Sequence, residues 1–209
     1  MKGRAGFYAS FAKRAVDLSL AAVALVVTAV PQALIALAVK ATSPGPVFFR
    51  QARVGRHGRL FRIVKFRTMT AGGPGRSPVT VAGSAWITPC GRFLRRWKLD
   101  ELPQLWNVLK GEMSFVGPRP DVPGFADRLS GDERRLLQLR PGITGPASLQ
   151  FADEEQRLAE VEDPERYNRE VLFPAKVRIN LHYLDNCSFR LDVKCLWDTL
   201  RLACGRRGQ

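Results

Sequence analysis

The sequence has few residues of the kinds that build metal centres and disulfide frameworks. It has four cysteines with no C-x-x-C pair, and its two histidines, His57 and His182, lie far apart. Without paired ligands at short spacing, a zinc site or a disulfide scaffold is not expected, and reduced cysteines in a cytosol-facing domain are the simpler interpretation. Internal repeats and low-complexity tracts are also absent. With 45% apolar residues the chain can bury a core, which excludes global disorder.

Acidic residues are missing from a long central part of the chain. After Asp17 the next carboxylates are Asp100 and Glu101, while arginines and lysines recur from Lys40 onwards. The whole sequence carries 33 Lys+Arg against 19 Asp+Glu, a formal net charge of +14. Such an excess indicates an anionic partner, and composition leaves nucleic acid, an anionic membrane surface and phosphorylated substrates open. A carboxylate pair isolated in this basic stretch is a candidate functional site.

Charge is absent altogether between Leu18 and Val39, a run of 22 residues. As a straight helix this run would measure about 33 Å, enough to cross a hydrocarbon core. It is too long for the apolar part of a signal peptide, and no small-residue cleavage site precedes the next segment. A simple membrane span fits the length. However, Pro31 would kink the helix, and both flanks are basic, so both ends prefer the cytosolic face.

These features predict two parts, a membrane-embedded segment and a cytosol-facing catalytic domain. Residues 1–40 are expected to form a re-entrant helix-hairpin kinked at Pro31, in preference to a span. Residues 41–209 are expected to adopt an α+β fold that is mostly helical, with amphipathic interfacial helices around the active site. Short apolar runs near residues 47–66 predict a small β-hairpin that turns at Gly55–Gly58.

Further elements follow from apolar spacing and from turn residues. Residues 71–84 are rich in Gly, Pro and Ser, which is typical of a mobile loop. Helices are predicted over 90–110 with a new start near Asp100, over 132–139, and over 153–186 with a break at Pro164. The tail from Asp192 to Arg207 is an amphipathic helix, compatible with resting on a membrane or with packing into the core.

One long motif carries a resemblance to a known family. The segment KLDELPQLWNVLKGEMSFVGPRP, residues 98–120, resembles the signature of bacterial sugar transferases, the monotopic phosphoglycosyl transferases. KRAVD at 13–17, KFRTM at 65–69 and RPGITG at 140–145 also resemble motifs of that family, in the same order. The similarity covers nearly the whole chain, and its size resembles the minimal members that lack extra transmembrane domains.

The resemblance implies an enzyme on the cytosolic face of the bacterial inner membrane. Members take a UDP-sugar, release UMP and leave a sugar phosphate on polyprenyl (undecaprenyl) phosphate, the first membrane step of exopolysaccharide, O-antigen or glycoprotein assembly. It implies a catalytic dyad, matched here by Asp100 and Glu101, in which Asp100 attacks the phosphate and binds the assisting Mg²⁺. Direct attack by the lipid phosphate, with Asp100 only a metal ligand, stays open. Neighbouring Arg95, Arg96 and Lys98 are expected to favour the ionised form of Asp100.

Several basic residues are candidates for binding substrate phosphates. Gly117-Pro118-Arg119-Pro120 is a stiff loop suited to presenting a guanidinium fork, although a structural turn with a surface arginine is the alternative. For the arginine of RPGITG, a loop-shaping role is equally compatible. The candidates are Lys65, Arg67, Arg95, Arg119 and Arg140.

Because the sequence departs from the family pattern at two places, the identity of the transferred sugar is not determined. Asn180 stands where an aspartate is expected ahead of a tyrosine, and residues 146–158 differ from the usual run. Galactose, glucose and N-acetylated sugars all remain candidates, as does any oligomeric state.

Three other interpretations compete with the enzyme. One is a basic nucleic-acid module with a membrane tether, but no nucleic-acid motif or interleaved aromatic platform is present, so no nucleic-acid partner is expected. Another is a membrane-anchored scaffold. A third reads Asp100 and Glu101 as an acidic first turn that complements a helix dipole. Anionic lipids are expected to contact the arginine-rich face beside the bilayer.

Overall fold

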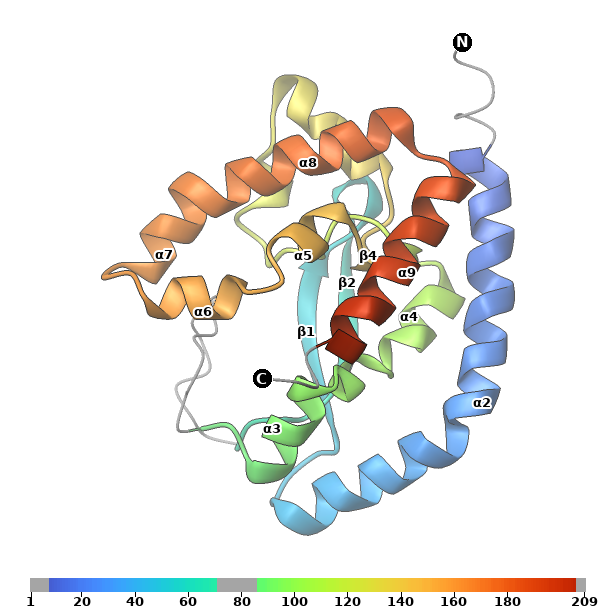
Figure 1. The fold of residues 1–209 in the computed structure, drawn as a ribbon, viewed down its shortest axis with the longest axis vertical. Helices are drawn as coiled ribbons and strands as arrows, with labels where there is room; N and C mark the ends of the chain where they lie inside the picture. The colour runs from blue at the N-terminus through green and yellow to red at the C-terminus, as the bar shows by residue number, and fades with distance from the viewer. Residues whose placement is uncertain (1–7, 71–85, 206–209) are drawn as a thin grey trace.

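The computed structural model describes residues 8–70 and 86–205 and shows a mostly helical chain with two small sheets (Figure 1). The loop expected over residues 71–84 lies outside the described residues. The α-helices are α2 (Lys13–Thr42), α3 (Pro89–Arg96), α4 (Gln104–Lys110), α5 (Pro146–Gln150), α6 (Glu154–Ala159), α7 (Pro164–Tyr167), α8 (Phe173–Asn186) and α9 (Phe189–Gly205). The strands are β1 (Phe48–Val54), β2 (Leu60–Phe66), β3 (Ser114–Val116) and β4 (Gly142–Thr144). Short 3₁₀ turns include η2 (Arg56–Gly58), η3 (Leu99–Glu101), η4 (Ala126–Arg128) and η5 (Gly131–Gln138), and π-turns are η1 (Tyr8–Ala12) and η6 (Asn168–Leu172).

Helix α2 is the long apolar element near the N-terminus. The sequence predicted two arms separated by a break, whereas helical structure continues through Pro31. A proline removes one backbone hydrogen bond and can bend a helix without ending it, and Figure 1 shows α2 changing direction partway along its length. Most of its apolar side chains are exposed, Val26 and Leu34 among them, and it is the one described helix long and apolar enough to cross a membrane.

The two ends of α2 pack against the rest of the protein, while its middle does not. Near its start Ala21 is buried in a cluster with Ile63 and Met113. Near its end Val39 is buried in another cluster with Leu94. The exposed apolar stretch therefore lies between two anchored ends.

The predicted hairpin is confirmed, with its turn at the expected place. Strands β1 and β2 pair antiparallel, with Phe48 opposite Phe66 and Val54 opposite Leu60. The turn η2 takes the chain through left-handed backbone at His57 (φ 59°) and Gly58 (φ 75°). Glycine adopts that conformation without strain, which explains its place at the tip.

The second sheet brings two sequence motifs together. Strand β3 pairs parallel with β4, Ser114 opposite Gly142 and Val116 opposite Thr144. Behind the strands, a Cβ on Gly117 would lie 2.4 Å from the Arg140 carbonyl oxygen. Only glycine permits this backbone approach, so RPGITG is the surface on which the Gly117–Pro120 loop rests.

The main core lies under α8 and α9. It joins Val116 of β3 to Val177 and Tyr183 of α8 and to Cys195 of α9. Residues on the other face of α9, including Trp197, are exposed. One face of α9 thus packs into the core, as one of the two predictions for the tail helix had it, and the opposite apolar face is exposed.

Candidate active site

The two carboxylates singled out in the sequence lie in η3, the turn that joins α3 to α4. Lys98 opens this turn in left-handed backbone (φ 55°), and Pro103 closes it as the N-cap of α4. Both side chains point inward: Asp100 is 7% exposed and Glu101 8%. A solvated acidic first turn, the structural alternative for this pair, would leave them in water.

Glu101 is held by two cations from distant parts of the chain. Its Oε1 accepts hydrogen bonds from Lys65 Nζ at 2.7 Å and from the Arg119 guanidinium at 3.1 Å. Burial opposes ionisation, but Lys65 and Arg119 outweigh it and hold the pKa of Glu101 well below its usual range. Glu101 is therefore a permanent carboxylate that fixes both cations in place.

Asp100 differs from Glu101 in its hydrogen bonding and in the direction of its pKa shift. Its Oδ1 is buried, and no hydrogen-bond partner for it lies within residues 8–70 or 86–205. Burial, and after it the charge of Glu101, raise the pKa of Asp100 against the opposing charges of Lys65, Lys98 and Arg95. Lys98 and Arg95 do favour the ionised form of Asp100, as expected, but burial and the charge of Glu101 outweigh them, so its pKa is raised.

A buried carboxylate oxygen without a hydrogen-bond donor keeps its lone pairs for a cation or an electrophile. Mg²⁺ is usually held by one or two carboxylates together with substrate phosphates. Across the described residues, no group of three or more His, Cys, Asp or Glu side chains is placed to hold a metal ion alone. Asp100 fits the sparse donor set that Mg²⁺ uses beside a diphosphate, and Glu101 Oε1 is already engaged.

Of the predicted phosphate-binding residues, Lys65, Arg95 and Arg119 come together here. Arg95 donates from Nε to Thr68 Oγ1 at 3.2 Å and acts electrostatically on Asp100. The Arg119 side chain keeps 45% of its surface exposed, so part of its guanidinium remains open to an incoming anion.

Arg67 and Arg140 donate hydrogen bonds to backbone carbonyls away from the dyad. The terminal nitrogens of Arg67 donate to the Pro44 carbonyl at 2.6 Å and to the Ser43 carbonyl at 2.7 Å, which ties the strand end to the residues after α2. Arg140 donates from Nε to the Gly111 carbonyl at 3.0 Å, at the far end of α4. For Arg140 these contacts favour the loop-shaping alternative.

Arg53 is a site residue that sequence reasoning missed. It donates to the Pro120 carbonyl at 3.1 Å, and burial, followed by the nearby charge of Arg119, lowers its pKa to about 10. A small cavity of about 20 Å³, the size of one water, is lined by Arg53, Ile63, Lys65, Gln104, Arg119 and Pro120. A usable signal was present: period-two alternation in the hairpin places Arg53 and Lys65 on one face.

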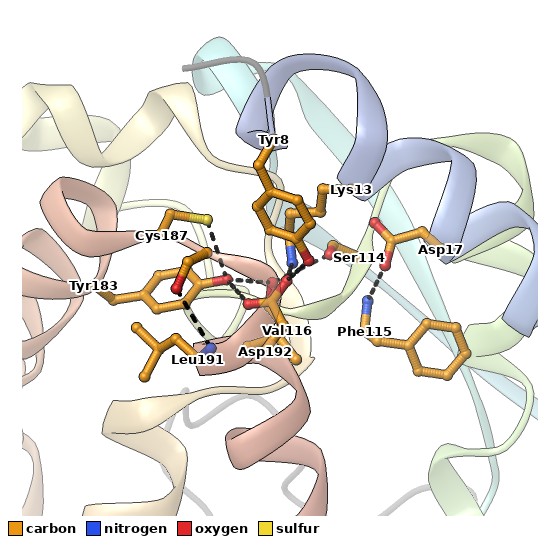
Figure 2. Close-up of polar contacts among 11 residues, drawn as sticks. Tyr8, Lys13, Asp17, Ser114, Phe115, Val116, Tyr183, Cys187, Leu191 and Asp192 are labelled. Carbon is orange, nitrogen blue, oxygen red and sulfur yellow. Dashed lines mark hydrogen bonds and ion pairs between the residues drawn. The ribbon is translucent and has the colours of Figure 1, made fainter. Parts of the chain in front are cut away.

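A second buried ionic cluster explains the KRAVD motif (Figure 2). Asp192 of α9 accepts hydrogen bonds from Lys13, from the Tyr8 hydroxyl at 2.7 Å and from the Tyr183 hydroxyl. Asp17 accepts from the Phe115 backbone N–H at 3.1 Å. We call these five side chains, Tyr8, Lys13, Asp17, Tyr183 and Asp192, the α2 clasp. It fastens the start of α2 to α8, α9 and β3.

Asn180, the departure in the penultimate helix, is a buried residue of α8. It is 5% exposed, and its Oδ1 has no hydrogen-bond partner in the part of the chain that the structure describes. The position is thus internal rather than on the helix surface.

Comparison with known proteins yields a consistent set of similarities. A sequence model described as bacterial sugar transferase matches residues 8–206. The "uncharacterized sugar transferase EpsL" of Bacillus subtilis is 34% identical over 189 residues, 90% of this chain and 85% of the relative. The UDP-glucose:undecaprenyl-phosphate glucose-1-phosphate transferase of Escherichia coli is 36% identical over 198 residues, 90% of this chain but 39% of the relative. An enzyme of the same name from Caulobacter vibrioides is 43% identical over 141 residues, covering 66% and 53%. The chain thus spans most of one relative and about half or less of the two larger ones.

Proposed function

Because the chain belongs to the bacterial sugar transferase family, we propose that it transfers a hexose-1-phosphate from a UDP-sugar to undecaprenyl phosphate with release of UMP. Transferases with this acceptor are named among its relatives. The observation that carries the proposal is the buried Asp100 Oδ1, which accepts no hydrogen bond from the described part of the chain and lies beside a carboxylate already neutralised by Lys65 and Arg119. A carboxylate that costs stability and has no structural partner is a strong candidate for chemistry.

The proposed reaction has two steps. An Asp100 carboxylate oxygen attacks the phosphorus that bears the sugar, and the bond from that phosphorus to the UMP oxygen breaks, so UMP leaves with the electron pair. A phosphate oxygen of undecaprenyl phosphate then attacks the same phosphorus, and the Asp100 carboxylate leaves. Glu101 keeps Lys65 and Arg119 aimed at the phosphoryl oxygens, where charge builds up in both steps.

Mg²⁺ is the cofactor proposed for this site. Asp100 and the substrate phosphates would hold it, and when bound it supplies positive charge to the diphosphate. That charge also favours the ionised form of Asp100, which the surrounding cations do not secure by themselves.

The membrane arrangement proposed is monotopic, with residues 1–40 embedded and residues 41–209 on the cytosolic face of the bacterial inner membrane. Support comes from α2: both of its ends pack on the same domain while its apolar middle is exposed. Exposed aromatic side chains on α3, α4 and α9 would lie at headgroup depth. These are Phe93, Trp97, Trp106 and Trp197. One substrate is water-soluble and the other carries its phosphate at the interface, so such a position serves both.

The test separates the covalent route from direct attack by the lipid. Purified protein with Mg²⁺ is mixed with a panel of UDP-sugars, first without and then with undecaprenyl phosphate. We expect about one equivalent of UMP per enzyme before lipid is added, and turnover afterwards. Release of UMP only after lipid addition would refute the covalent intermediate. An enzyme that releases no UMP from any UDP-sugar under either condition would refute the proposed function.

A further inference from the structure

Helix α6 places two consecutive glutamates against cations of the active site. Glu154 accepts from Lys176 Nζ of α8 at 2.5 Å. Glu155 lies 3.8 Å from an Arg95 nitrogen. The charge of Glu154 also acts on Arg119. An acidic helix from the sequence-divergent segment 146–158 thus borders the dyad.

A second carboxylate faces the same place. Asp121 follows Arg119 by two residues on the same loop, and its surroundings include Lys176, Arg53 and Glu154. Charged side chains of both signs therefore interact here: Arg119 pairs with Glu101, and Lys176 pairs with Glu154, whose charge also acts on Arg119. The Glu154 and Lys176 side chains keep 27% and 17% of their surface exposed, so this outer part remains accessible.

The chemistry of this outer part differs from that of the dyad. Carboxylates repel phosphate oxygens, but they accept hydrogen bonds from hydroxyl groups. In a UDP-sugar the phosphorus attacked by Asp100 carries the sugar directly, through one oxygen. If Arg119 binds that phosphate, the hexose lies beside it. Two carboxylates are coupled to this region: the charge of Glu154 acts on Arg119, and Asp121 follows Arg119 by two residues.

We propose that Glu154 and Asp121, with Lys176 holding Glu154 in place, form the hexose-recognition wall of this enzyme. The ligand class is a hexose with free hydroxyls, which these carboxylates read by accepting hydrogen bonds. The inference rests on the proposed function and deepens it, because it assigns sugar choice to named residues. A site built to bond a particular hydroxyl discriminates strongly, since the wrong epimer leaves an acceptor without its donor.

The experiment compares substrates within each variant. Glu154→Gln, and the charge-balanced double variant Glu154→Gln/Lys176→Gln, are assayed with UDP-glucose, UDP-galactose and their N-acetylated counterparts. We expect the ratio of kcat/KM between the preferred sugar and its epimer to fall about tenfold or more. Inhibition by UMP, which lacks the hexose, should change less than about twofold. Glu160→Gln, at the exposed C-terminal end of α6, is the matched control and should leave both quantities unchanged.

Two results would overturn the inference while leaving the proposed function intact. One is an equal fall in kcat/KM for every sugar in both variants. The other is a parallel loss of UMP inhibition, which would assign the wall to the nucleotide. A wild-type enzyme inactive with all UDP-sugars would instead refute the proposed function, and the inference with it. The double variant guards against misfolding, because it leaves no unpaired Lys176 charge.

Discussion

The dyad and the α2 clasp are both buried ionic clusters, but they treat their carboxylates in opposite ways. In the clasp, the two oxygens of Asp192 accept from a lysine and two tyrosine hydroxyls. Burial raises the pKa of Tyr183 well above its usual range, so its hydroxyl stays a donor. In the dyad, Glu101 Oε1 accepts from Lys65 and Arg119, while Asp100 Oδ1 has no partner among the residues that the structure describes.

This difference separates a structural role from a chemical one. A buried charge whose hydrogen bonds are all made is compatible with a stable fold. Removing one partner of the pair destabilises the protein, because the other charge is then buried without compensation. A buried carboxylate that is left open costs stability, and its retention needs a function. Stability and activity should therefore respond oppositely to the same kind of substitution at the two clusters.

The largest effect is expected for Asp100→Asn. The amide keeps the shape but removes the attacking oxygen, so UMP release should fall at least about 10⁴-fold. Thermal stability should be unchanged or slightly raised, because a buried charge is lost. Steady-state UMP release and a thermal shift assay in detergent measure the two quantities. The exposed Glu133→Gln is the control, and an Asp100→Asn protein with undiminished turnover would erase the distinction between the clusters.

The converse is expected at the clasp. Lys13→Met leaves Asp192 buried without its cation, which should cost about 3–5 kcal/mol in the free energy of unfolding. Chemical denaturation in detergent checks this. Substituting Asp192→Asn as well should recover part of the loss, since the unpaired charge disappears. If Lys13→Met abolished turnover but left the free energy of unfolding unchanged, the α2 clasp would have a catalytic role and not a structural one.

Arg119→Lys tests the cation that touches both Glu101 and the open side of the site. Lysine keeps the charge but loses the fork geometry that binds a phosphate through two nitrogens. We expect kcat/KM to fall about 10- to 100-fold, with little change in the melting temperature. A large drop in stability with normal kcat/KM would mean that Arg119 has a structural role, like the residues of the α2 clasp.

Arg140→Gln should show the opposite balance on a smaller scale. Its guanidinium binds the Gly111 carbonyl and is partly exposed, so its loss should cost about 1 kcal/mol of stability. We expect kcat/KM to change less than about twofold. A strong rise in KM for UDP-sugars would restore the phosphate-binding role that the motif implied.

The smallest effect concerns pH. Burial raises the pKa of Asp121 to about 6, above its value of about 3.9 in an unfolded chain. Between these two values the folded state holds more protons than the unfolded state, so this group makes stability fall as pH rises through that window. Melting temperatures from pH 4 to 7 should show the slope reduced in Asp121→Asn. An unchanged slope would mean that Asp121 is solvated like a surface carboxylate.

Local elements were well predicted because they depend on neighbours in the chain. The hairpin and the apolar α2 follow from spacing, turn residues and composition, while the helix start expected near Asp100 is a 3₁₀ turn, with α4 beginning at Gln104. A re-entrant helix-hairpin kinked at Pro31 was expected; the helix is continuous through Pro31 and changes direction partway along its length, with both ends packed on the rest of the protein (Figure 1). Among the basic candidates, position in a motif did not distinguish Arg119, at the dyad, from Arg67 and Arg140, which bind backbone carbonyls.

By itself the sequence determined the family, the long exposed apolar helix and the identity of the two carboxylates, since each of these is written in contiguous residues. Only the tertiary structure decided which charges meet. Glu101 is joined to Lys65 across 36 positions and to Arg119 across 18, while Asp192 reaches Lys13 across 179. Burial and electrostatic coupling depend on distance in space, and no local pattern reports that distance.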